Sequence, residues 1–208
     1  LSMLNGKLED TNVLIRAGIG IRLYKGVQSV YGYTNETNEE SLNALVDDLR
    51  GGFGIKSKSV SISLIEETHE NLHPIKENPV KASLESKVAL MLRANDAAKA
   101  YSDKIQKVSV GLASVCQNVQ ISNSEGRLVQ DTRIRCRMSV SSFAQEGQNL
   151  QSGYEAPGAS KGLEFFEERT PESIGKEASR IALVLLEAKD CPSGKMPVII
   201  DNGFGGVI

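Results

Sequence analysis

One short string in the chain has the residue types and spacing of a catalytic metal site. Residues 69–73 read His-Glu-Asn-Leu-His, an H-E-x-x-H pattern. On a helix this spacing places two imidazoles one turn apart on one face, where they can bind zinc while the glutamate activates a metal-bound water. Pro74 follows directly, however, and proline disfavours helical geometry at the residue before it. Since these are the only two histidines and no third ligand is evident, we favour a solvated linker at His69, Glu70 and His73.

The other reactive side chains are more typical of structural positions than of catalytic or ligand-binding sites. Acidic clusters could bind a cation or exchange protons, but they are more typical of solvated helix ends and loops. Cysteines within strand-like runs predict small buried hydrophobic side chains, and a glycine-rich run without a lysine predicts a turn. We therefore predict no catalytic, metal-binding or cofactor-binding residue in the chain. The residues considered are Asp47-Asp48, Glu66-Glu67, Glu164 with Glu167-Glu168, Cys116, Cys136, and residues 202–206.

Composition narrows the class of protein. The 208 residues carry 24 basic and 26 acidic side chains, a net charge of -2. A protein that binds nucleic acid or an anionic membrane would need a basic surplus, so we expect neither partner. No apolar run is long enough to span a bilayer, and three scattered cysteines favour a reducing compartment. We expect a soluble, cytoplasmic protein.

The first part of the chain predicts a small α+β unit. Alternating apolar residues indicate strands, and the turn at Lys25-Gly26 joins the first two as a hairpin. Asn38, followed by two glutamates, is a favourable helix start, and Gly51-Gly52 ends that helix. The predicted elements, in the order β-β-α-β, are strands at 13–23 and 27–33, the helix from Asn38, and a strand at 60–64.

A second α+β unit is predicted after a linker. Residues 66–81 contain two prolines, both histidines and no periodicity, so we place a domain boundary there, between residues 1–65 and residues 82–208. The fold class is α+β, with two subdomains in which antiparallel or mixed sheets pack against helices. The second subdomain is predicted to contain a helix from Ser83 to about Tyr101, strands at 108–115, 118–122, 128–131 and 133–143, a flexible loop at 147–162, a helix from Thr170 to about Lys189, and a strand at 196–200.

Several stretches, in the same order, resemble the TldD/PmbA family of metallopeptidases, whose PmbA branch is often labelled modulator of DNA gyrase. The similarity covers nearly the whole chain. Its most extended part is the run from Ser124 to Arg133, which is similar to the pattern S/T-x-G-x-L-x-x-D-x-R of the central domain. The other similar stretches are Leu8-Glu9-Asp10, Gly18 to Arg22, Gly32-Tyr33-Thr34, Lys107 to Ala113, Arg137 to Val140, Glu177 through Leu185, and Gly194 to Val198.

The resemblance implies where the catalytic metal of such a protein would lie. In TldD-type members, the step that is similar to Gly206-Val207-Ile208 runs into a helix bearing His-Glu-x-x-x-His, and a downstream cysteine adds the third zinc ligand. The present sequence ends before that helix, and a helix and strand expected before Leu8 are also missing. We therefore expect a truncated chain that carries no cofactor of its own and is inactive alone, while zinc is expected in a full-length TldD-type parent.

The resemblance also implies a role for these residues. They would form the scaffold and substrate-confining portion of a metallopeptidase that acts on unfolded or short peptides, within a homo- or heterodimer of TldD/PmbA-type subunits. An exposed strand edge could hold such peptides with little side-chain preference. Two alternatives stay open: a metal-free PmbA-like partner subunit, and an autonomous zinc enzyme that uses His69, Glu70 and His73.

Overall fold

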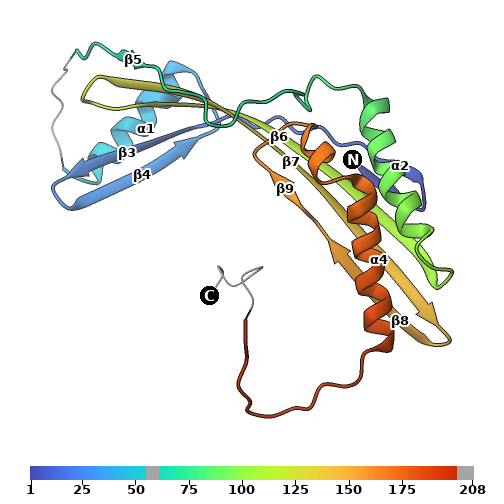
Figure 1. Ribbon diagram of the computed structural model, residues 1–208. Coiled ribbons are helices and arrows are strands. Elements are labelled where there is room, and N and C mark those ends of the chain that lie inside the picture. Colours follow the sequence, from blue (N-terminus) through green and yellow to red (C-terminus); the bar gives the residue numbers. More distant parts are fainter. Residues whose placement is uncertain (55–60, 201–208) are drawn as a thin grey trace.

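The protein is an α+β molecule, as predicted, and its described residues form one large sheet and one two-stranded sheet (Figure 1). A computed structural model describes residues 1–54 and 61–200. The strands are β1 (Ser2–Leu4), β2 (Lys7–Asp10), β3 (Ile19–Lys25), β4 (Gln28–Thr34), β5 (Ile65–Glu67), β6 (Ile105–Ser122), β7 (Arg127–Glu146), β8 (Asn149–Glu155) and β9 (Gly158–Ala159). The helices are α1 (Glu39–Gly51), α2 (Leu84–Lys99), α3 (Phe165–Glu168) and α4 (Pro171–Glu187).

Two long antiparallel strands, β6 and β7, organise the large sheet. Its strand order is β2-β1-β6-β7-β5, and β8 and β9 pair with β7 as well. The sequence predicted four short strands here, which was wrong: the chain runs through both apparent breaks without leaving the ladder. The polar residues that suggested the breaks, around Gln117 and Thr132, lie on strands whose two faces are both exposed, so they need no turn.

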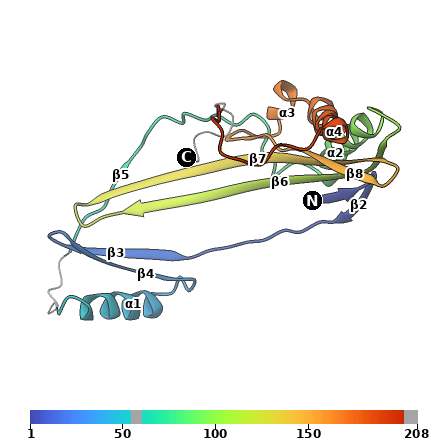
Figure 2. The ribbon, with the colours of Figure 1, turned by 90° about the horizontal axis from the view of Figure 1, so that it is seen from below.

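Helices α2 and α4 cover one face of only part of this sheet, and the rest of β6 and β7 extends beyond them (Figures 1 and 2). We call this extension the arm; it comprises residues 113–122 of β6, the turn, and residues 127–133 of β7. Gly126 adopts a φ of +91° in the turn, and a Cβ there would lie 2.8 Å from the Ser63 carbonyl oxygen. The turn therefore requires glycine at this position.

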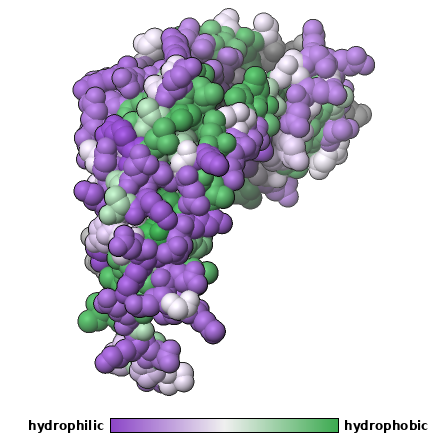
Figure 3. Space-filling model, turned by 90° about the vertical axis from the view of Figure 1, so that its right-hand side faces the viewer, coloured by the Kyte–Doolittle hydropathy of each residue, from purple (hydrophilic) through white to green (hydrophobic). Residues whose placement is uncertain are grey.

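The hydrophobic core lies between the two helices and the covered half of the sheet. Ser83 and Thr170 cap α2 and α4, as predicted, by accepting hydrogen bonds from Ser86 N and Ser173 N. The helices approach so closely that a Cβ on Gly175 would collide with the Ala94 carbonyl. Apolar side chains also show among hydrophilic ones on the side of the molecule drawn in Figure 3. The largest fully buried apolar side chains are Met3, Met91, Ile105, Met138, Ile174, Val108, Val110 and Val140.

The second sheet pairs β3 with β4 and packs against α1. Asn38 caps α1 by accepting a 2.8 Å hydrogen bond from Ser41 N, so the predicted hairpin and helix are confirmed. Strand β3 begins at Ile19, however, and the prediction that it begins at Val13 was wrong. Val13 and Ile15 are 88% and 89% exposed, and no sheet or helix of the described residues covers them. Alternation alone does not make a strand when nothing packs on its apolar face.

Three further predicted elements differ from the structure. Residues 61–64 have no regular structure, and the nearby strand is β5, inside the predicted linker; residue 60 lies outside the described residues. The predicted loop at 147–162 instead contains β8 and β9. Residues 196–200 are exposed and form no strand, and the turn predicted at 202–206 lies outside the described residues.

The glycine of β8, Gly153, explains why the composition of this segment suggested a loop. A Cβ on Gly153 would collide with the Ala178 carbonyl of α4, so the strand needs glycine in order to pass under the helix.

At the amino terminus, Met3 of β1 pairs with Val110 of β6, which places residues 2–10 in the large sheet. The predicted division at residues 66–81 stays a prediction. None of the helices among the described residues is long and apolar enough to cross a membrane.

Candidate functional site

The arm has one strand edge that is open along its length. On one side β6 pairs with β7 as far as Ser122, but on the other side β1 pairs only with Ser109, Val110 and Gly111. The last contacts on that side join Leu112 to Leu1: the Leu112 N–H donates to the Leu1 carbonyl oxygen, and the Leu1 amino group donates to the Leu112 carbonyl oxygen, each at 3.0 Å. Beyond it, no strand within residues 1–54 and 61–200 pairs with β6. We call the outer side of residues 113–122 the β6 edge.

The alternation of the ladder determines which backbone groups the β6 edge presents. The Leu112 N–H and the Val108 carbonyl both face β1, where they bond to Leu1 O and Asn5 N. In an antiparallel sheet every second residue points its N–H and C=O to the same side. The even-numbered residues of the arm therefore direct one donor and one acceptor each into solvent. These residues are Ser114, Cys116, Asn118, Gln120 and Ser122.

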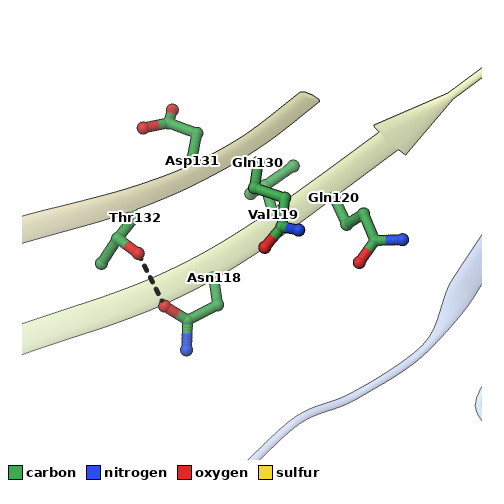
Figure 4. Close-up of a pocket in the computed structure, with 6 residues that line it drawn as sticks. All are labelled: Asn118, Val119, Gln120, Gln130, Asp131 and Thr132. Atoms are coloured by element: carbon green, nitrogen blue, oxygen red, sulfur yellow. Dashed lines mark hydrogen bonds between the residues drawn. The ribbon is translucent and has the colours of Figure 1, made fainter. Parts of the chain in front are cut away.

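The side chains of these even-numbered residues are uncharged and share one face of the arm. Figure 4 shows two of them, Asn118 and Gln120, with Gln130 and Thr132 of β7. The Thr132 hydroxyl on β7 donates a 3.0 Å hydrogen bond to the Asn118 Oδ1 directly across the ladder. A shallow hollow of about 410 Å³ lies here, and amide side chains dominate its lining. Such a lining can accept and donate hydrogen bonds, and its one ionisable group is the carboxylate of Asp131, which stays ionised at neutral pH.

The opposite face of the arm combines aliphatic and charged side chains. Val115 and Ile121 of β6 are 55% and 56% exposed there, and Arg133 and Asp131 of β7 form a 2.7 Å ion pair. The hydrogen bond from Arg133 lowers the pKa of Asp131 below its ordinary value. A second hollow, of about 270 Å³, lies between this face and the start of the segment that follows β5. Its lining residues are Glu67, Thr68, His69, Val119, Ile121, Val129, Asp131 and Arg133.

The H-E-x-x-H string does not have the geometry of a zinc site. His69, Glu70 and His73 are exposed and lie in a segment without helix, so the two imidazoles do not share one helical face. The His73 N–H instead donates to the Asn71 Oδ1, 2.9 Å away, in a local bend. Among the residues that the structure describes, no three histidine, cysteine or acidic side chains lie close enough to bind a metal. The zinc of a TldD-type enzyme does not fit these residues.

Each acidic cluster contains a carboxylate that has a partner. Asp47 pairs with Arg50 at 2.8 Å, and Glu67 pairs with Arg127 at 3.0 Å. Glu164 is only 8% exposed, and its carboxylate accepts hydrogen bonds from the backbone N–H groups of residues 76, 77 and 162. Burial acts to raise the pKa of Glu164, but these hydrogen bonds outweigh it and lower the pKa. The carboxylate therefore fastens the segment after β5 to the start of α3.

One of the two cysteine predictions was correct. Cys136 is buried, and burial raises the pKa of its thiol to about 11. Cys116 is exposed, contrary to prediction, because it lies on the arm, where no helix covers the sheet. Sequence periodicity could not reveal the β6 edge, since an edge is defined by the absence of a neighbouring strand.

The comparisons with known proteins agree with this fold. A family model described as "PmbA/TldA metallopeptidase central domain" matches residues 77–186, and "PmbA/TldA metallopeptidase domain 1" matches residues 1–51. The chain therefore belongs to the PmbA/TldD metallopeptidase family. The metalloprotease TldD homolog of Haemophilus influenzae is 29% identical over 211 residues, which cover 98% of this chain and 44% of that protein. The TldD homolog of Buchnera aphidicola from Acyrthosiphon pisum is 27% identical, with coverages of 98% and 44%.

Solved structures share the fold at low identity. A putative modulator of a DNA gyrase from Thermotoga maritima superposes with a TM-score of 0.65 and 19% identity, covering 93% of this chain and 43% of that one. TldE from Thermococcus kodakarensis gives a TM-score of 0.58 and 15% identity, with coverages of 86% and 40%. The chain thus spans less than half the length of the relatives that it matches.

Proposed function

We propose that this chain is the scaffold and substrate-confining portion of a TldD/PmbA-type metallopeptidase that acts on unfolded or short peptides. In this proposal the β6 edge holds the peptide as an added strand. The proposal assigns no residue of the chain to a catalytic zinc site, so hydrolysis itself is not assigned to it. The protein acts as a dimer of TldD/PmbA-type subunits in the cytoplasm.

The observation that carries the proposal is the unprotected character of the β6 edge. Natural proteins usually protect a free strand edge with lysine, proline, a bulge or a covering element. The run from Val108 to Ser124 contains no charged residue and no proline, and β6 and β7 pair along the arm without a bulge. Five successive outward-facing donor and acceptor pairs therefore remain available to an extended chain. Main-chain pairing of this kind requires an unfolded substrate and tolerates many sequences.

Proline at an outward-facing position tests the proposal. Gln120→Pro removes one outward N–H, while the bonds of the ladder to β7 belong to the odd-numbered residues and stay intact. Gln120→Ala is the matched control, because it removes the side chain and keeps the N–H. Fluorescence anisotropy with a labelled, unstructured ten-residue peptide measures binding to the purified chain.

We expect Gln120→Pro to weaken peptide binding by about tenfold, which corresponds to roughly 1.4 kcal/mol for a lost main-chain hydrogen bond and its strained neighbours. Gln120→Ala should bind within twofold of the unmodified chain. Equal binding by the proline and alanine variants, or no peptide binding by the unmodified chain, would contradict the proposal.

A further inference from the structure

Three arginines follow one another on the same face of β7 where the arm joins the covered sheet. Arg133, Arg135 and Arg137 are spaced two residues apart, so their side chains point to the face that also carries Val115. All three are exposed. It is the face of the arm described above as carrying aliphatic and charged side chains, opposite to the face of Asn118 and Gln120.

The three guanidinium groups have different partners. Arg133 is neutralised by Asp131, 2.7 Å away. Arg137 donates to the Ala156 carbonyl oxygen at 3.1 Å and to the Tyr154 hydroxyl at 3.4 Å. Arg135 makes no hydrogen bond or ion pair with any residue in the described ranges 1–54 and 61–200. Its charge is therefore available for a ligand.

The position of Arg135 relates it directly to the β6 edge. Arg135 lies opposite Val115, the neighbouring residue across the ladder. Val115 has an odd number, so a residue of an added peptide that faces Val115 would point its side chain to the same face. That residue would lie about 10 Å from Arg135 across two strand spacings, with only the short valine side chain between them. An extended arginine and a glutamate can meet over that distance.

We infer that Arg135 is a specificity-determining residue, which selects extended peptides that carry a carboxylate side chain on the face of Val115. This inference rests on the proposed function, because it assumes that the peptide pairs with the β6 edge. The net charge along this stretch supports it: the pair between Arg133 and Asp131 cancels, and Arg135 and Arg137 leave a positive face. On the other face of the same edge the side chains of the even-numbered residues are uncharged, so no comparable selection for charge acts there.

Three labelled peptides of ten residues test the inference by fluorescence anisotropy with the full 208-residue chain. They share a threonine- and serine-rich sequence and differ only at three alternate positions, which carry glutamate, glutamine or lysine. Alternate placement puts the three charges on one face, so the result does not depend on a shift of two residues or on the direction of the peptide. The variants are Arg135→Gln and Arg135→Glu. Lys176→Gln on α4, at an exposed position, controls for the loss of one positive charge.

We expect the unmodified chain to bind the glutamate peptide about fivefold more tightly than the glutamine peptide, as for one favourable exposed ion pair, and the lysine peptide most weakly. The preference should decrease with added salt. Arg135→Gln should reduce the preference to within twofold, Arg135→Glu should reverse it in favour of lysine, and Lys176→Gln should preserve it. Circular dichroism of each variant reports whether the fold is kept.

Different binding results would contradict the proposed function and the inference about Arg135. If none of the three peptides binds to the unmodified chain, the peptide-binding function itself is wrong, and the inference falls with it. If all three bind equally, or if Arg135→Gln keeps the preference for glutamate, the β6 edge binds peptides but Arg135 does not select them, and only the inference is overturned.

Discussion

Ser179 of α4 and Ser142 of β7 meet in the fully buried core, where their hydroxyl oxygens lie 2.8 Å apart. Ser179 is also 2.9 Å from the Ala98 carbonyl oxygen at the end of α2. The pair therefore connects both helices to the long strand that continues into the arm. With Ser142 donating to Ser179, and Ser179 donating to Ala98, each hydroxyl hydrogen has an acceptor.

Removing both serines of this pair should cost little more than removing one. Ser179→Ala leaves the Ser142 hydroxyl without its acceptor in the buried core, while the Ala98 carbonyl keeps its hydrogen bond from Tyr101 N, so we expect a loss of about 1–3 kcal/mol in the free energy of unfolding. Ser142→Ala together with Ser179→Ala removes both hydroxyls, so the second substitution should add little. Urea denaturation of the two single variants and the double variant gives the coupling energy, and additive losses would contradict the proposed network.

A methyl group at Gly175 should separate the two helices. The Cβ would collide with the Ala94 carbonyl, so Gly175→Ala should destabilise the chain by about 1–3 kcal/mol or more, although alanine is the better helix former. Gly51→Ala is the control, because Gly51 ends α1 with no atom within 4 Å of the added methyl. That variant should be neutral or more stable by about 0.5–1 kcal/mol. Equal urea midpoints for the two variants would show that the helices do not cross so closely.

The buried carboxylate of Glu164 should make stability depend on pH. Its pKa is lower in the folded chain than in the unfolded chain, so its stabilisation is complete above the ordinary glutamate pKa of about 4.3 and is lost as the pH falls through the folded value. Glu164→Gln should lose about 1–3 kcal/mol at neutral pH, because an amide nitrogen would face backbone donors. The difference from the unmodified chain, measured by urea denaturation, should shrink in acid.

Glu168→Gln is the appropriate comparison for that experiment. Glu168 is exposed and pairs with Lys161, at 2.6 Å, so its replacement should change stability by less than about 1 kcal/mol. If the difference between Glu164→Gln and the unmodified chain persists unchanged at low pH, the carboxylate is not the group that holds the backbone.

The three thiols should react at two different rates. Cys116 and Cys191 are exposed, whereas Cys136 is buried, donates to the Gly162 carbonyl at 3.1 Å and has a pKa of about 11. A disulfide reagent at about pH 8 should therefore modify two thiols rapidly, and the third only after denaturation. Cys116→Ser should leave one rapid thiol. Because Cys116 is on the arm, bound peptide should also slow its modification, and rapid reaction of all three thiols would refute the placement of Cys136.

The helix ends were the most predictable part of the fold. Asn38, Ser83 and Thr170 all cap the helices that they were expected to begin, because a cap is a local hydrogen bond that depends on neighbouring residues only. The α+β class and the family could likewise be recognised from elements and motifs in order.

The strands were less predictable, because their limits depend on distant partners. Residues 13–18 alternate but find no neighbour, whereas the glycine-containing β8 becomes a strand because β7 and α4 are beside it. The same reason hid the candidate site: the importance of Arg135 and Gln120 comes from an unoccupied neighbouring position, which no local pattern records.

The continuity of β6 from the core into the arm has a dynamic consequence. The amides of Ser109 and Gly111 bond to β7 in the part of the sheet that the helices cover, so they exchange their hydrogens with solvent only when that packing opens, whereas those of Val115 and Val119 need only the separation of two strands. One strand therefore holds two populations of amides with very different lifetimes. A peptide that adds a strand to the β6 edge would slow the exchange of the arm amides. The arm and the covered half of β6 would then open more nearly as a single cooperative unit.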